Sequence, residues 1–402
     1  MTAWGLAWRT IARSPARSVL AVCGVTVIGA LLFTMLLLSR GLLVSFRDLL
    51  DEAGFNIRVI AAEGSMVHRL PIAGAASLAA AIARVPGVQR VTRVRMDSAA
   101  VNVPGSHDPI TGVALVGTTD IGAGWTMVKG SPLPASTPAG APVPVVVSAH
   151  LAAALHLEPG ADLRIRLTSP GSASALPIVN AHVGGVAIFQ FEAADESTVA
   201  TTLEGFARAH GQTSSDQAEM LLVAARPEEA DAAAQAIAKL RPDLHVLSND
   251  QMMAQFNENA FSYFRQISTV LSSMTLAFAF LLVATLLTMS VNRRLGEVAA
   301  LRALGFPRRR IAANLLWESA LLVGVGGAAA LPVGGLLAMI LDRILRQMPG
   351  VPSALHFFVF EPRTVVLHAA LMTGTAVVAA IYPIWVATRL PIAETLRREI
   401  VS

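Results

Sequence analysis

Residues 292–310 read Asn-Arg-Arg-Leu-Gly-Glu-Val-Ala-Ala-Leu-Arg-Ala-Leu-Gly-Phe-Pro-Arg-Arg-Arg and lie between two long apolar runs. Within this stretch, apolar residues recur every three positions, close to the helical period: Leu295, Val298, Leu301 and Leu304. Gly305 suits a left-handed C-terminal cap, and Pro307 prevents the helix from continuing. The stretch therefore predicts a short basic helix with a defined end, held between two membrane spans.

Charged residues give this helix a direction. Glu297 lies near its start, where a negative charge favours the helix dipole, and it is spaced to pair with Arg294 or Arg302. The alternative is a charged loop anchored at lipid headgroups, but an apolar stripe followed by Gly-x-Pro is more organised than an anchor requires. We interpret the helix as an element that receives a push from a soluble partner.

The composition is that of a membrane protein. Hydrophobic residues make up 54% of the 402 residues, charged residues only 14%, and the mean hydropathy is +0.58. A membrane span needs about 20 apolar residues. Stretches free of Asp, Glu, Lys and Arg reach this length in four places: Val19–Leu38, Thr269–Val291, Ser319–Leu341 and Thr364–Thr388. The first is longer than a signal-peptide core and lacks a cleavage site, so we expect a retained anchor.

Arginines set the expected orientation. They are concentrated before the first span, in residues 292–310 and after the last span, which places both termini in the cytoplasm. Residues 41–265 hold 15 basic and 21 acidic residues, a net charge of −6, although the whole chain carries +4. The basic balance therefore reflects membrane topology, and no basic patch with interleaved aromatic residues indicates nucleic-acid binding.

About 225 residues between the first two spans have ordinary soluble character, enough for one large or two small domains. Short β-rich runs such as Val143–Val147 alternate there with helix-like stretches such as Ala75–Arg84. The expected fold is membrane α-helical with four transmembrane helices, plus an α+β extracytoplasmic domain inserted between helices 1 and 2.

Motifs for chemistry are missing from the sequence. Cys23 is the single cysteine, and no His-Glu-x-x-His or Cys-x-x-Cys motif indicates a metal site. Lys129 and Lys239 are the two lysines, and neither lies in a Walker loop. We therefore predict no catalytic residue, no metal and no cofactor in this chain. If ATP and Mg²⁺ are used, a partner ATPase binds them.

The third span carries small residues four positions apart: Gly326, Ala330, Gly334 and Ala338. Such a stripe lets two helices approach closely. The sequence leaves open whether the partner helix belongs to the same chain or to a second copy. Glu318, near the cytoplasmic end of this span, is spaced to pair with Arg309 or Arg310, or to reach the interface.

The segment Glu297-Val-Ala-Ala-Leu-Arg-Ala-Leu-Gly305, followed by a basic stretch and a span, resembles the signature of FtsX-like, MacB-type ABC permeases. The closing Arg389-Leu-Pro-Ile-Ala-Glu-Thr-Leu-Arg397 is similar to the tail of that family, and Thr111–Gly117 with Val145–Leu157 resembles its outer core. The layout of one span, a large outer domain and three further spans is also similar.

The resemblance implies ATPase-coupling roles for residues of the cytoplasmic helix: Glu297, Val298, Leu301, Arg302, Leu304 and Gly305. It implies two copies of an ABC ATPase as partners, a second permease copy or paralogue, a periplasmic adaptor or acceptor protein, and membrane lipid. The location implied is the bacterial cytoplasmic (inner) membrane. The function implied is ATP-driven transmission to the outer domain, which moves lipoprotein, lipid, peptide or drug substrates.

The alternative is a non-transporting membrane scaffold or signalling protein that displays its outer domain and regulates cell-envelope partners. Neither function makes the chain itself an enzyme. The expected bounds are residues 1–18 for the cytoplasmic N-terminus, 19–40 for helix 1, 41–265 for the outer domain with its stalk ends, 266–291 for helix 2, 292–310 for the coupling helix, 311–341 for helix 3, 342–363 for an external loop, 364–388 for helix 4 and 389–402 for the cytoplasmic C-terminus.

Overall fold

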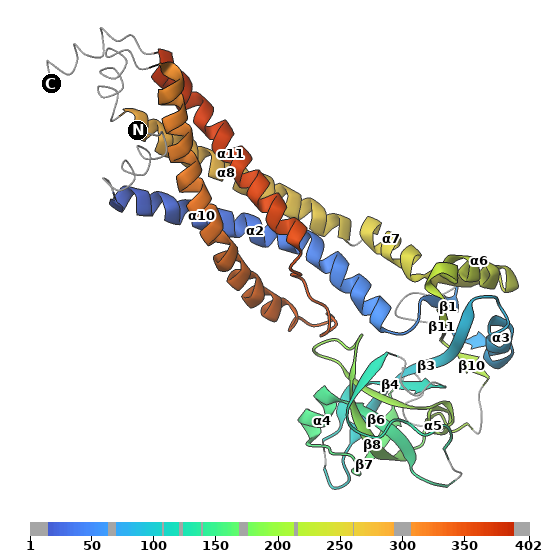
Figure 1. Cartoon of the computed structure of the whole chain (residues 1–402). Coiled ribbons are helices and arrows are strands. Elements are labelled where there is room, and N and C mark those ends of the chain that lie inside the picture. Colours follow the sequence, from blue (N-terminus) through green and yellow to red (C-terminus); the bar gives the residue numbers. More distant parts are fainter. Residues whose placement is uncertain are drawn as a thin grey trace. The chain divides into compact units, whose positions relative to one another are not determined.

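The computed structural model describes residues 15–62, 70–106, 108–119, 124–137, 140–168, 176–212, 216–259, 261–292 and 307–389. The chain divides into two compact units (Figure 1). The first comprises Met1–Leu43, Phe261–Arg343 and Phe357–Ser402, and the second comprises Val44–Ala260 and Ile344–His356. The elements α2 and α10 contribute residues to both units.

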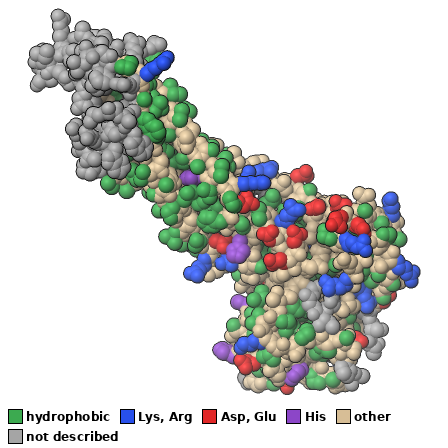
Figure 2. Space-filling model, viewed as in Figure 1, with side chains coloured by type: hydrophobic (Ala, Val, Ile, Leu, Met, Phe, Trp, Pro, Cys, Tyr) green, Lys and Arg blue, Asp and Glu red, His purple; other side chains and the backbone are tan. Residues whose placement is uncertain are grey.

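Long apolar helices build the first unit: α2 (Pro15–Glu52), α8 (Phe261–Asn292), α10 (Arg308–Leu345) and α11 (Pro362–Arg389). Among the described residues, these four are long and apolar enough to cross a membrane. Figure 2 shows hydrophobic side chains along them, whereas Lys, Arg, Asp and Glu gather on the second unit. The predicted fold class, four spans with an α+β domain between the first and second, is confirmed.

The helices α2 and α10 run parallel. Thr26 of α2 donates to the carbonyl of Gly326, and Thr34 donates to the carbonyl of Gly334, each at 3.2 Å. The offset between the partners is 300 residues in both pairs, so the two helices advance in the same direction over this distance. Two parallel spans begin on the same side of the membrane.

The helices α8 and α11 run the opposite way. Gly24, early in α2, lies against Leu282, while Ser268, earlier in α8, donates to the carbonyl of Met35 at 2.8 Å. The contacts of α10 with α11 also run in reverse order, Ser319 with Ala376 and Gly327 with Met372, and Gly335 then contacts Phe360 just before α11. Alternating directions are what four consecutive spans require.

The helix ends differ from the predicted bounds. The third span was predicted to end at residue 341 and the fourth to begin at residue 364, but α10 continues to Leu345 and α11 begins at Pro362. The reason is Asp342, which is 8% exposed and accepts hydrogen bonds from the backbone N–H groups of Phe357 and Phe358 at 2.8 and 3.4 Å. An acidic residue whose carboxylate binds backbone N–H groups can lie inside the helix. A search for uncharged stretches instead ends the predicted span before that residue.

The second unit holds a ten-stranded sheet in the order β12-β1-β11-β3-β4-β9-β6-β8-β5, with β7 paired to β3 and β8. Its strands are β1 (Ile57–Ala61), β3 (Val88–Asn102), β4 (Ile110–Thr118), β5 (Trp125–Gly130), β6 (Val143–Ser148), β7 (Asp162–Leu167), β8 (Val179–Phe189), β9 (Ser197–Thr202), β11 (Met220–Ala225) and β12 (Leu244–Ser248), and a separate pair is formed by β2 (Ile72–Ala73) and β10 (Gln217–Ala218). The helices are α3 (Ala75–Ile82), α4 (Ala149–Leu155), α5 (Leu203–Ala209), α6 (Ala230–Leu240) and α7 (Asn249–Asn259), with a 3₁₀ turn η1 (Pro227–Glu229).

Strand β7 closes part of this sheet into a ring, because β3, β4, β9, β6, β8 and β7 pair in succession and β7 returns to β3. Alternation along β7 shows why: Leu163, Ile165 and Leu167 are buried, while the polar residues between them point outward. The enclosed core also contains Val145 and Phe206, both fully buried. This lobe is a closed barrel.

A second lobe uses the other end of the same sheet. Strands β1, β11 and β12 pack their inner faces against α3 and α6, and Ile57, Ile82, Leu221 and Ile237 lie in that core. Strand β3 has 15 residues, pairs with β11 at its start and with β4 and β7 farther along, and so belongs to both lobes.

The compact unit that holds the outer domain, predicted over residues 41–265, also includes part of a later loop. Residues 344–356, within the predicted external loop 342–363, belong to this second unit. Pro352 forms an isolated antiparallel bridge with Ala193, and the N–H of His356 donates to Ser45 Oγ at 2.7 Å. This contact was not predictable, because hydrogen bonds between backbone groups leave no pattern in the order of side chains.

Candidate functional site

The predicted ATPase-coupling residues lie outside the described residues: Glu297, Val298, Leu301, Arg302, Leu304 and Gly305. Their roles therefore stay predictions. The described residues nearest to them in the chain are the end of α8 and the start of α10, so the site can be followed from those two helices.

Ser290 near the end of α8 donates a hydrogen bond of 2.8 Å to Glu318 near the start of α10. Both side chains are almost fully buried, at 3% and 2% exposure. An acidic side chain inside a membrane span requires a polar partner of this kind. The bond links the two helices on either side of residues 293–306, and Ser290 was not singled out in the sequence.

The small-residue stripe of α10 packs against α2. A Cβ atom at Gly326 would lie 2.7 Å from Val25 Cγ1, and one at Gly334 would lie 2.8 Å from the carbonyl oxygen of Ala30. Ala330 lies opposite Gly29, where an added Cβ would approach it to 2.8 Å. The stripe thus faces a helix of its own chain, and we call this contact the α2–α10 seam.

The seam continues toward the C-terminal half of α10, where Ala338 is fully buried beside Phe33 and Leu37 of α2. Hydroxyls reinforce it, because Thr34 is completely buried and donates toward the carbonyls of both Ala30 and Gly334. Hydrogen bonds of this kind between membrane helices contribute about 0.6 kcal/mol on average. The threonines were missed in the sequence, although Thr26 and Thr34 are spaced eight residues apart, as are Gly326 and Gly334.

Another close approach involves Gly41 of α2. A Cβ there would lie 2.5 Å from the backbone nitrogen of Val359 and 2.6 Å from the carbonyl oxygen of Phe357. Only glycine fits, because backbone atoms cannot move aside as a side chain can. The segment that leads into α11 is therefore bound to α2 by backbone contact.

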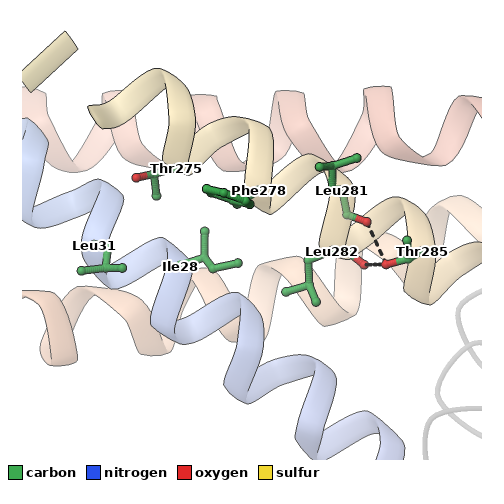
Figure 3. A pocket seen from close by; sticks show the side chains of 7 residues that line it. All are labelled: Ile28, Leu31, Thr275, Phe278, Leu281, Leu282 and Thr285. Carbon is green, nitrogen blue, oxygen red and sulfur yellow. Dashed lines mark hydrogen bonds between the residues drawn. The ribbon is translucent and has the colours of Figure 1, made fainter. Parts of the chain in front are cut away.

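An open groove of about 390 Å³ runs between α2 and α8 (Figure 3). It is lined by apolar residues and two threonines: Ile28, Leu31, Thr275, Phe278, Leu281, Leu282 and Thr285. Thr275 and Thr285 donate to carbonyls of their own helix, so they present no free donor to the groove. The surface suits lipid chains or an apolar helix rather than a polar ligand.

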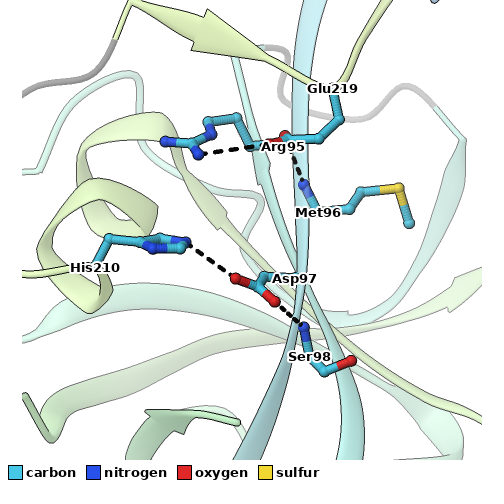
Figure 4. A network of polar contacts seen from close by, with 6 residues as sticks. All are labelled: Arg95, Met96, Asp97, Ser98, His210 and Glu219. Atoms are coloured by element: carbon cyan, nitrogen blue, oxygen red, sulfur yellow. Dashed lines mark hydrogen bonds and ion pairs between the residues drawn. The ribbon is translucent and has the colours of Figure 1, made fainter. Parts of the chain in front are cut away.

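The outer domain contains a buried polar network where its two lobes share β3 (Figure 4). Arg95 is 6% exposed, its Nη2 lies 3.4 Å from Glu219 Oε1, and its guanidinium stacks 4.7 Å from the Phe206 ring. Glu219 also accepts from the N–H of Met96 at 3.0 Å. Strand β3, helix α5 and the residue between β10 and β11 are joined through these contacts.

Beside this pair, His210 Nε2 lies 3.3 Å from Asp97 Oδ2, and the other carboxylate oxygen accepts from the N–H of Ser98 at 2.7 Å. The cluster has a base and an acid, but Ser98 takes part through its backbone N–H and not its hydroxyl, so these contacts do not activate a nucleophile. We interpret the network as a joint between the lobes. Within the described ranges, no group of three or more His, Cys, Asp or Glu side chains is placed to hold a metal ion.

Comparison with known families gives two matches. The FtsX-like permease C-terminal family matches residues 269–392, and the MacB-like periplasmic core domain family matches residues 18–240, more than half of the chain. None of the curated proteins compared with the chain matches it.

Two solved structures resemble the chain. The periplasmic region of MacB from Actinobacillus actinomycetemcomitans is 16% identical with a TM-score of 0.39, over 52% of this chain and 96% of that one. The extracellular domain of the noncanonic ABC-type transporter YknZ from Gram-positive bacteria is 11% identical with a TM-score of 0.34, over 48% of this chain and 100% of that one.

Proposed function

Because the chain belongs to the family of FtsX-like permeases with a MacB-like periplasmic core domain, and is therefore the membrane subunit of an ABC transporter, we propose that it transmits ATP-driven movement to its extracytoplasmic domain. Substrate is then moved on the outer side of the membrane and need not pass between the spans.

The α2–α10 seam is the observation that carries this proposal. A push on residues 292–310 reaches the two flanking helices, α8, which ends at Asn292, and α10, which begins at Arg308. Tight backbone packing at Gly326 and Gly334 makes α2 follow α10, since little slack exists between them. The helix α2 is continuous to Glu52 and contributes its last residues to the second unit.

The partners follow from the same proposal. ATP and Mg²⁺ bind to a separate ABC ATPase, present in two copies, and this chain contributes no cofactor site. A second permease copy or a paralogue completes the assembly, and a periplasmic adaptor or acceptor protein receives the substrate. The location is the bacterial cytoplasmic (inner) membrane, with membrane lipid around the spans.

The substrate class that we propose is lipoprotein, lipid, peptide or drug. The apolar groove between α2 and α8 supports an apolar cargo or lipid at the spans, because the two threonines in its lining already donate to carbonyls of their own helix. Charged substrates would meet the outer domain instead, where charged side chains gather.

The test is reconstitution of the full-length chain with its candidate ATPase in lipid nanodiscs. We expect a stable complex, ATP hydrolysis that depends on the permease, and an ATP-dependent change in the distance between spin labels on the two outer domains. If the chain forms no complex with a Walker-containing ATPase, the proposal is contradicted and the scaffold alternative is favoured.

A further inference from the structure

The loop between α10 and α11 is bound through its backbone to the turn between β8 and β9. Three hydrogen bonds join them: Gly350 N to Asp195 Oδ1 at 2.9 Å, Ala194 N to Val351 O at 3.2 Å, and Ser353 N to Glu192 O at 3.0 Å. We call these contacts, together with the bridge between Ala193 and Pro352, the clasp. They belong to the second unit alone.

The carboxyl group of Glu192 is buried beside Ser148, whereas its backbone carbonyl binds the loop. Glu192 is 8% exposed, and its Oε1 is buried with no hydrogen-bond partner among the described residues. Its carboxyl group lies near the hydroxyl of Ser148, which caps α4, and near the backbone N–H of Thr198 in β9. One residue therefore holds the loop with its backbone and enters the domain with its acid group.

Burial raises the pKa of Glu192 from an ordinary value of 4.5 to about 7. Desolvation is the largest cause, and hydrogen bonds from Ser148 and Thr198 oppose it. Glu196, on the same turn, adds a repulsive charge. The protonated form thus fits the site, and the ionised form carries an incompletely solvated charge.

Ionisation of Glu192 bears on the clasp, because its carboxyl group and the backbone carbonyl that binds the loop belong to the same short turn. A movement of the turn that brings the ionised carboxylate to water also moves the carbonyl that accepts from Ser353. Of the neighbouring acids, Glu196 repels an ionised Glu192 and accepts from the N–H of Ala193 at 3.4 Å, whereas Asp195 accepts from the N–H of Gly350 across the clasp. The groups that face Glu192 from β6 and β9, Ser148 and Thr198, are neutral.

We propose that the clasp is a proton-dependent latch, closed when Glu192 is protonated and released when it ionises. The latch would control how the loop between the third and fourth spans is held by the outer domain. This inference goes beyond the transport proposal and holds whether or not an ATPase drives the chain.

The sign follows from linkage. A pKa that is raised in the closed state gives a stabilisation that is fully present below about 4.5 and is lost as the pH rises through about 7. If the released turn has the ordinary pKa of 4.5, the closing equilibrium falls about tenfold between pH 6 and pH 8. Acid outside the membrane therefore closes the latch.

Hydrogen exchange of the full-length protein in nanodiscs tests this. The reporters are peptides that contain Ala194 and Ser353, whose N–H groups bond across the clasp, and each rate is divided by its intrinsic rate. We expect protection to fall about tenfold from pH 6 to pH 8. Glu192→Gln, which imitates the protonated acid, should keep the pH 6 protection at pH 8.

Two controls accompany it. Glu158→Gln removes an exposed acid of the same domain and should behave as the parent protein does. His356→Gln, present in every protein compared, removes the histidine on the loop from the titration. Equal protection at both pH values in the parent, or no gain in Glu192→Gln at pH 8, would overturn the latch. Peptides from Val143–Ser148 check that the barrel stays folded in each variant.

Discussion

Substitution of Gly334 by alanine is the sharpest test of the α2–α10 seam, because α10 contains a matched control. A Cβ at Gly334 would lie 2.8 Å from the carbonyl oxygen of Ala30 and 3.2 Å from its Cα. A Cβ at Gly324, in the same helix, would meet nothing within 4 Å. The two substitutions are chemically identical and differ only in what the new methyl group contacts.

The expected cost can be estimated from these contacts. The methyl group at residue 334 approaches a backbone atom by about half an ångström more than ordinary contact allows, and overpacking of this kind costs about 1–3 kcal/mol. Separation also weakens the bond from Thr34 to the carbonyl of Gly334, which contributes about 0.6 kcal/mol. The gain in helix propensity is common to both variants. Gly334→Ala should therefore be less stable than Gly324→Ala by about 1.5–3.5 kcal/mol.

Unfolding by sodium dodecyl sulfate in mixed micelles, followed by circular dichroism, measures this difference. Gly334→Leu should lower the stability further, whereas Gly324→Leu should not. If the free energies of unfolding of Gly334→Ala and Gly324→Ala agree within about 0.5 kcal/mol, the seam is not tightly packed. The proposed transmission from α10 to α2 is then refuted.

Leu301→Asp should lower the association of the chain with its ATPase by several kcal/mol, because it buries an unpaired carboxylate, while Arg309→Gln should cost far less; pull-down with quantified ATPase distinguishes them. In a cysteine-free background, an impermeant maleimide should label a cysteine at Ser174 in intact cells but not one at Arg293, and the reverse pattern would contradict the orientation. Glu219→Ala should destabilise the outer domain by about 3–5 kcal/mol, since Arg95 loses its buried partner; an unchanged melting temperature would argue against a structural joint.

The four spans and the family were predictable because both depend on local sequence. Apolar runs without charge define spans wherever they occur, and the Glu297–Gly305 segment carried the family resemblance. The stripe of Gly326 and Gly334 was visible for the same reason, as spacing along one helix. The helix that packs against this stripe was not predictable, since the spacing of small residues indicates a close helix contact but does not identify the partner helix.

The clasp could not be predicted for a different reason. Its bonds join the backbone of residues 350–353 to a turn more than 150 positions earlier, and backbone groups are the same in every residue. Nothing in the sequence around Glu192, between Phe191 and Ala193, indicates that this acid is buried. Its burial depends on Ser148 and Thr198, which only the fold brings to the turn.

The contacts along the proposed route share one physical property, which is that they involve backbone atoms. Carbonyls of Gly326 and Gly334 accept from α2, Gly41 touches the chain before α11, and Ser353 bonds the carbonyl of Glu192. A side chain absorbs a small displacement by changing rotamer, but a backbone atom in close contact transmits it. The helix α10 therefore has two outputs, through its side to α2 and through its loop to the clasp. The clasp contains Glu192, whose ionisation the latch depends on, so acid would act on the branch that runs through the loop.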